Sequence, residues 1–158
     1  MKKLILLLLF IPLISFSQTY KDVMSIKSVE MFMKVAIENG YEFDSVDEDE
    51  WVTYGYNIIK DSIKGNKSAK WMGYSQKDHK FSLAFSRTST LFGIKENLDD
   101  TEYDLIVKEI KEKCKYYKIL NHKGTAYVTY SCSDSSYKGK IGFVIEEGWG
   151  YIRHFPEE

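Results

Sequence analysis

Two stretches of this chain show the same succession of hydrophobic patterns, and this repetition limits the possible folds more than any single motif. Each stretch begins with apolar residues spaced three and four apart, the period of one helix face. Three segments with apolar residues at every second position follow, as in strands with one buried face. The stretches are residues 18–92 and 93–158, which join near residues 89–100. We therefore expect one compact domain made of two tandem α-β-β-β repeats.

The helices are predicted from their apolar stripes and their caps. The first runs from Ile26 to Glu38 and ends before Gly40, a residue that commonly terminates helices. The second follows Thr101, which forms a capping-box pattern with Asp104. Its apolar stripe comprises Tyr103, Ile106, Ile110, Cys114 and Tyr117. The opposite face of this second helix is rich in lysine and glutamate, which indicates a solvated surface.

Six strands are predicted, at residues 51–59, 69–76 and 80–87 and at residues 124–132, 138–146 and 149–155. Residue types correspond between the halves, since Met72-Gly73-Tyr74 is matched by Ile141-Gly142-Phe143. Short connections between consecutive strands favour antiparallel pairing. The predicted fold class is α+β, with a mostly antiparallel sheet and both helices packed on one face. In outline this resembles secreted inhibitor modules with duplicated α/β units, such as β-lactamase inhibitor protein, although no sequence motif is shared.

The N-terminus is typical of a bacterial secretory signal peptide. Lys2 and Lys3 precede a short apolar run, and small residues up to Ser17 offer a cleavage site. The apolar run is shorter than the roughly 20 residues that a membrane span needs. We predict removal of residues 1–17 and export to the periplasm or the extracellular space, with no membrane span in the mature chain. Loss of the two lysines changes the formal charge from −1 (22 basic, 23 acidic) to −3 (20 basic, 23 acidic), which argues against nucleic-acid binding.

The chain has two cysteines, Cys114 on the stripe of the second helix and Cys132 on the apolar side of the strand after it. An even cysteine count in an exported protein favours a disulfide bond. A free buried thiol is the next interpretation. A metal site or a cysteine nucleophile comes last, because no clustered histidines or cysteines accompany these residues. We predict a Cys114–Cys132 disulfide, no metal and no cofactor.

No established catalytic motif is present, so an enzyme is not the first expectation. The acidic segment at residues 44–50 lacks calcium-loop spacing and indicates a solvated connection. One alternative is a small hydrolase in which His154 works with Asp134 or Ser133. That function requires the histidine and its partner to lie within hydrogen-bond reach.

The sheet face turned away from the apolar stripes carries the strongest functional signal. Alternation places aromatic residues, threonines and glycines there, and exposed patches of this kind mark interaction sites. The candidate binding residues are Trp51, Thr53, Trp71, Tyr127, Thr129 and Trp149. The leading hypothesis is a non-catalytic binding or inhibitor module whose partner is another protein or an envelope or extracellular ligand. A structural component of an envelope complex is a further alternative.

Overall fold

The computed structural model describes residues 18–91, 94–97, 101–133 and 135–157, so the predicted signal peptide lies outside the described residues. Three helices and ten strands are found in these ranges. In chain order they are α1 (Tyr20–Ser25), α2 (Val29–Glu38), β1 (Tyr41–Val46), β2 (Trp51–Tyr56), β3 (Lys70–Ser75), β4 (Lys80–Ser86), β5 (Thr88–Leu91), β6 (Ile94–Asn97), α3 (Glu102–Lys113), β7 (Lys115–His122), β8 (Thr125–Ser131), β9 (Gly139–Glu146) and β10 (Trp149–Pro156).

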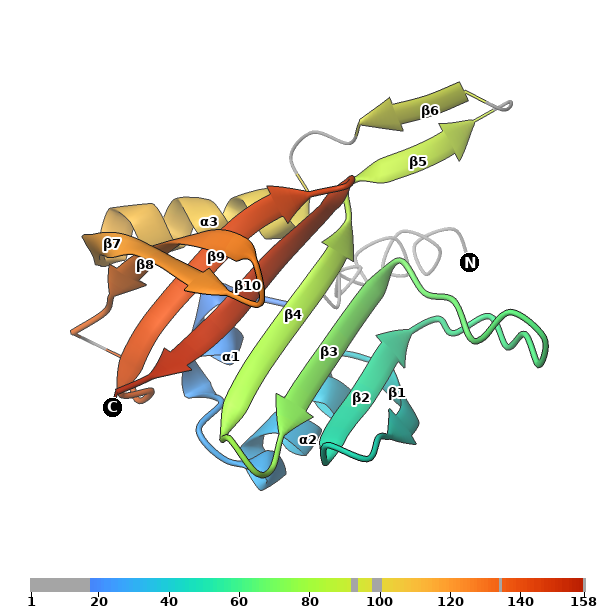
Figure 1. Cartoon of the computed structure of the whole chain (residues 1–158), viewed down its shortest axis with the longest axis horizontal. Coiled ribbons are helices and arrows are strands. Elements are labelled where there is room, and N and C mark those ends of the chain that lie inside the picture. Colours follow the sequence, from blue (N-terminus) through green and yellow to red (C-terminus); the bar gives the residue numbers. More distant parts are fainter. Residues whose placement is uncertain (1–17, 92–93, 98–100, 134, 158) are drawn as a thin grey trace, which may run out of the picture.

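Eight of the strands form one sheet in the order β1-β2-β3-β4-β10-β9-β8-β7 (Figure 1). Every neighbouring pair is antiparallel, so the predicted α+β class and the mostly antiparallel sheet are confirmed. The first four strands of the sheet form one half and the last four form the other. The halves meet where β4 pairs with β10. The remaining strands, β5 and β6, form a separate hairpin, which lies between the two halves in the sequence.

The six predicted strands are present within a few residues of their expected ends, but each half of the sheet contains a fourth strand. These additional strands are β1 and β7, the two edges of the sheet. Only Tyr41 is buried in β1, and no residue of β7 is fully buried. Edge strands that bury so few side chains lack the alternation by which strands are recognised.

The helix boundaries also differ from the prediction. Helix α2 begins after Ser28, whose hydroxyl accepts a hydrogen bond from the Met31 backbone, so Ile26 lies before the helix. Helix α3 ends at Lys113, because the backbone of Cys114 is already extended, with φ −118° and ψ 158°. The predicted stripe therefore breaks at its last two members, and Tyr117 belongs to β7.

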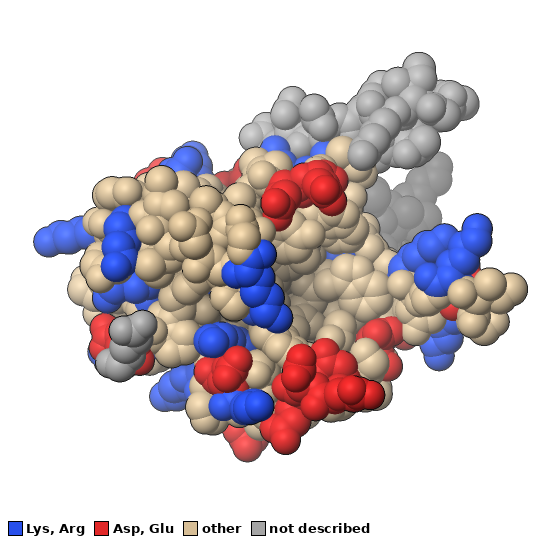
Figure 2. All heavy atoms as spheres, viewed as in Figure 1, with Lys and Arg blue, Asp and Glu red and all other residues tan. Residues whose placement is uncertain are grey.

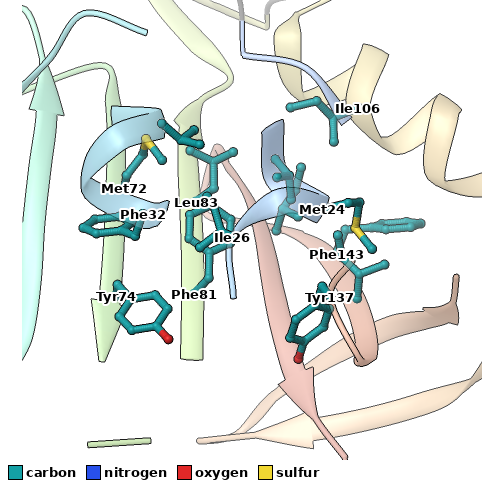
Figure 3. Packing of buried hydrophobic residues seen from close by; sticks show 14 of the residues in the cluster. Met24, Ile26, Phe32, Met72, Tyr74, Phe81, Leu83, Ile106, Tyr137 and Phe143 are labelled. Atoms are coloured by element: carbon teal, nitrogen blue, oxygen red, sulfur yellow. The ribbon is translucent and has the colours of Figure 1, made fainter. Parts of the chain in front are cut away.

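The core is formed by buried side chains of the helices together with buried side chains of the sheet (Figure 3). Phe32 of α2 packs its ring against Tyr54, Tyr74 and Phe81, with ring centroids 5.5 to 6.4 Å apart. Tyr103 of α3 packs against Phe85, 6.3 Å away. Helix α1 adds Val23 and Met24, both buried. In the described part of the chain, no helix combines the length and apolar character needed to cross a membrane.

Candidate binding face

The face of the sheet opposite the core, called the outer face below, is crossed by a row of small residues with one arginine at its centre. Arg153 of β10 pairs with Ser82 of β4 on one side and with Gly142 of β9 on the other. The row continues outward through the paired residues Gly73 and Thr53 in the first half and Thr129 in the second. Because small side chains flank Arg153 across the sheet, larger side chains from adjacent rows can lean over the row.

Two tryptophans lie flat on this face because glycines beneath them leave room. A Cβ atom at Gly55 would stand 2.7 Å from the Trp71 ring, and one at Gly73 would stand 3.1 Å from the Trp51 ring. A real Cβ would push either ring away from the sheet. Covering a strand glycine with a cross-strand aromatic ring is an established way to stabilise a β-sheet. Both tryptophans remain half-buried and keep part of their surface exposed.

Together these residues line an open hollow of about 270 Å³, called the aromatic hollow below. Its lining residues are Trp51, Thr53, Trp71, Met72, Gly73, Ser82, Ala84 and Arg153. Figure 2 looks onto this side of the molecule and shows a depressed surface of uncharged side chains near the centre, with acidic side chains at the lower and upper edges. The hollow lies mainly over the first half of the sheet. It contains three of the predicted binding residues, Trp51, Thr53 and Trp71.

The predicted binding residues on β8 are closed off. Strand β8 pairs with β9 only from Val128 to Ser131, whereas β7 and β8 stay paired up to their turn. The end of the hairpin therefore leaves the line of the sheet, and its turn overlies β10 in Figure 1. The His122 ring near this turn lies 6.4 Å from that of Phe155 on β10.

Tyr127 and Thr129 are consequently 5% and 0% exposed, which corrects the expectation that they belong to an open surface. The Tyr127 ring packs against Phe155, and the Thr129 hydroxyl donates to the Lys118 carbonyl at 2.5 Å. The sixth candidate, Trp149, is half-buried where β10 begins and does not line the hollow. Curvature of an edge hairpin over its own sheet removes this part of the predicted face.

Arg153 is the member of the site that the sequence prediction did not name. Its guanidinium carbon lies 5.3 Å from the centre of the Trp51 ring, a distance typical of a cation–π contact. Its Nε atom is buried and has no hydrogen-bond partner among the described residues. The signal was available, because residues 149, 151 and 153 alternate onto the same face of the last strand.

The histidine proposed for hydrolysis does not lie at the surface. His154 is 1% exposed and stacks on Tyr137, with 3.7 Å between ring centroids. Complete burial lowers the pKa of His154 to about 3, an effect that a hydrogen bond with the Val23 backbone partly opposes. Asp134 lies outside the described residues, and the Nε2 atom of His154 is buried with no hydrogen-bond partner among them. A substrate in solvent has no access to this histidine.

The predicted disulfide is present. The sulfur atoms of Cys114 and Cys132 are bonded, and the two Cα atoms are 4.4 Å apart. The bond joins the residue after α3 to the residue after β8. No group of three or more histidine, cysteine, aspartate or glutamate side chains suited to a metal ion occurs within the described ranges.

Comparisons with protein-family models, with curated proteins and with solved structures found no match for this chain.

Proposed function

We propose that this protein is a non-catalytic binding module that holds a protein partner against the aromatic hollow. The observation that carries the proposal is the pair of half-buried tryptophan rings, fixed flat on Gly55 and Gly73 in an open depression of the sheet. Rigid aromatic side chains lose little conformational entropy on binding and are enriched among the residues that dominate protein interfaces. A surface of this kind is already arranged for contact before the partner arrives.

We further propose that the module consists of two tandem repeats with their helices on a single side. Support comes from the element order, since each half contains a helix followed by four consecutive antiparallel strands. On the core side, Phe32 covers the first half of the sheet, and Tyr103 reaches Gly150 of the second half, where a Cβ would stand 2.6 Å from its ring. This arrangement leaves the first half of the outer face open for a partner. Export remains a prediction, with which the disulfide is compatible.

The proposal is tested by capture from an envelope extract of the source cell, followed by rebinding of the purified partner. Trp71→Ala removes one ring, and Ala84→Gln adds a longer neutral side chain to the hollow without removing any packing. We expect either change to weaken binding by about thirtyfold or more, as loss of a central interface residue does. Isothermal titration calorimetry measures the affinity.

The matched control is Leu105→Gln, which alters an exposed apolar residue on α3, away from the hollow. This variant should bind as the unaltered protein does. Thermal unfolding of each variant separates loss of binding from loss of fold. Full binding by a folded Ala84→Gln variant would show that the partner does not use the hollow.

A further inference from the structure

The chain contains two arginines, and among the described residues an acid is found for only one of them. Arg87 lies 2.6 Å from both carboxylate oxygens of Asp104 on α3 and also donates to the Thr101 hydroxyl. Arg153, in the aromatic hollow, forms no ion pair with any carboxylate of the described residues. The two sites thus differ in one respect: the structure itself supplies the anion for Arg87 and does not supply it for Arg153.

The surroundings of Arg153 increase the significance of this difference. The residue is half-buried, and its Nε–H group is shielded from solvent without an acceptor. Its cross-strand neighbours Ser82 and Gly142 carry no charge. A guanidinium that has lost part of its hydration gains most from a planar carboxylate, which accepts two parallel hydrogen bonds from it. The Trp51 ring holds the side chain on one side and leaves such an anion room within the hollow.

The charged groups near Arg153 largely offset one another. Burial is the main cause of a lowered pKa at His122, and Arg153, Lys80 and Lys123 lower it further, whereas Asp78 acts in the opposite direction. Lys80 is paired with Asp78 at 3.4 Å. The Glu146 carboxylate also lies at the β7–β8 turn, where it accepts a hydrogen bond from the Thr125 hydroxyl at 3.0 Å and offsets the charge of Lys123. Arg153 is therefore the cation that faces the aromatic hollow.

The edges of the same face have the opposite sign. The β1–β2 turn carries Asp47, Glu48, Asp49 and Glu50, and the β9–β10 turn carries Glu146 and Glu147. Figure 2 shows acidic side chains at the lower and upper edges of this view. A partner with a broadly acidic surface would be repelled at both edges. The pattern fits a partner with a single acid at the centre of its contact surface and neutral or basic residues around it.

We infer that the partner presents one aspartate or glutamate side chain to Arg153, beside the Trp51 ring. This inference rests on the proposed function and specifies the chemistry of the group that enters the aromatic hollow. Arg153 is then the centre of specificity, and the tryptophans supply contact area around it. The inference also accounts for a half-buried cation that the protein leaves without a counter-charge.

The test is a nuclear magnetic resonance titration of the purified protein at neutral pH and constant ionic strength. The probe is benzoate, an aromatic carboxylate, and benzamide is its neutral counterpart of the same shape. With two arginines in the chain, the two Nε–H signals can be observed separately. We expect benzoate to shift the signals of Arg153 Nε–H and Trp51 Nε1–H. The dissociation constant from these shifts should be at least about tenfold lower for benzoate than for benzamide, which is the discrimination that one charge-assisted hydrogen bond provides. The signal of Arg87 serves as an internal control and should not move.

Variants and a second anion complete the test. Arg153→Gln should abolish the preference for benzoate, and Arg153→Lys should retain part of it because the charge remains. Equal shifts with benzoate and benzamide would overturn the inference. So would inorganic phosphate binding more tightly than benzoate at these two signals, because that result would identify a phosphate site.

The failure of this inference can be distinguished from failure of the proposed function. Suppose that Ala84→Gln abolishes capture of the partner, but benzoate binds at Arg153 no more tightly than benzamide. The proposed binding module is then supported, and the inference of a carboxylate at Arg153 is wrong. If benzoate binds at Arg153 but folded Ala84→Gln captures its partner normally, the hollow is an anion site and the proposed docking surface is wrong. With the purified partner, Arg153→Gln should weaken binding by about thirtyfold, and the partner's critical acid should be found by replacing its carboxylates one at a time.

Discussion

Three glycines hold aromatic rings against the outer face of the sheet. Gly55 lies beneath Trp71, Gly73 beneath Trp51, and Gly142 beneath Phe155, where a Cβ would stand 2.7 Å from the Phe155 ring. Glycine in a strand is ordinarily unfavourable, since it has no side chain to pack and loses the most backbone entropy on folding. Here the covering rings offset part of that cost. The same contact that stabilises the strand also fixes the ring that a partner would meet.

His154 should lower the stability of the folded protein in acid, and replacing this histidine with a side chain that does not titrate should remove that effect. Burial lowers the pKa of His154 to about 3 from its ordinary value of 6.5, so in this interval the unfolded chain binds a proton that the folded protein excludes. The contribution to stability is complete above about pH 6.5 and is lost as the pH falls toward 3, by about 1.4 kcal/mol per pH unit.

The measurement is urea unfolding of the unaltered protein and of His154→Phe between about pH 6 and about pH 4. Phenylalanine keeps a ring for the stack on Tyr137 and does not titrate. The carboxylates and His122 contribute in both proteins and therefore cancel in the difference. If the free energy of unfolding had the same pH dependence in both proteins, His154 would bind a proton as readily in the folded protein as in the unfolded chain.

At the scale of residues, sequence alternation correctly placed Trp51, Thr53 and Trp71 on one face, because those side chains lie in strands at the middle of the first half-sheet. It also placed Tyr127 and Thr129 on the outer face, but it contained no information about the hairpin that covers them. Arg153 was missed for a different reason. An unpaired arginine is recognised only when every neighbouring carboxylate has a known position, and sequence patterns do not supply those positions.

The position of the β7–β8 hairpin determines how much of the outer face is open to solvent. Its two strands are enclosed by the Cys114–Cys132 disulfide, which spans 18 residues in sequence. The bond fastens the start of β7 to the residue after β8, so the base of the hairpin is fixed next to the end of α3. From this fixed base the tip bends over β10 and buries Tyr127 and Thr129.

Loss of the disulfide should destabilise the protein by about 3 kcal/mol, since the unfolded chain would regain the entropy that closure of this loop removes. We expect a Cys114→Ala/Cys132→Ala variant to unfold at a correspondingly lower urea concentration. Adding a reductant should lower the stability of the unaltered protein and leave that of the double variant unchanged. Equal sensitivity of both proteins to the reductant would contradict the structural role of the bond.

Most elements with one buried face were predictable, but α1, which buries Val23 and Met24, was not predicted because six residues are too few to show a helical period. The six strands with a buried face were found within a few residues of their ends, whereas β1 and β7 were not found because most of their side chains face solvent. The ends of the helices depended on local backbone geometry. Cys114 continues the apolar stripe of α3 in sequence, but it adopts an extended backbone conformation that places its sulfur beside that of Cys132.

The molecule as a whole depends on one seam, the pairing of β4 with β10. Ile152 lies at this seam, paired with Leu83 of β4 and Phe143 of β9, and it is completely buried. On the opposite face of the sheet, the next residue, Arg153, borders the aromatic hollow. The core and the aromatic hollow are therefore connected through neighbouring residues of a single strand.

Ile152→Ala should lower the free energy of unfolding by about 3 kcal/mol, through lost burial and the cavity that remains. Ile145→Ala, which alters an exposed isoleucine of β9, should change it by no more than about 0.5 kcal/mol. The indole signals report each half separately, because Trp51 and Trp71 lie in the first half and Trp149 lies in the second. We expect all three to lose intensity at one common, lower urea concentration. An unchanged midpoint for Trp51 and Trp71 would show that the first half folds independently of the seam.

The strand that fills the middle of the sheet, β10, is the last of the eight in chain order. Until Trp149–Pro156 has emerged, β4 and β9 each have an unpaired edge and nothing joins them, so a nascent chain has two incomplete half-sheets to offer. We therefore expect the complete sheet to form only after β10 is available. If the predicted export holds, a sheet that is closed by its last strand would keep the chain unfolded for longer before translocation.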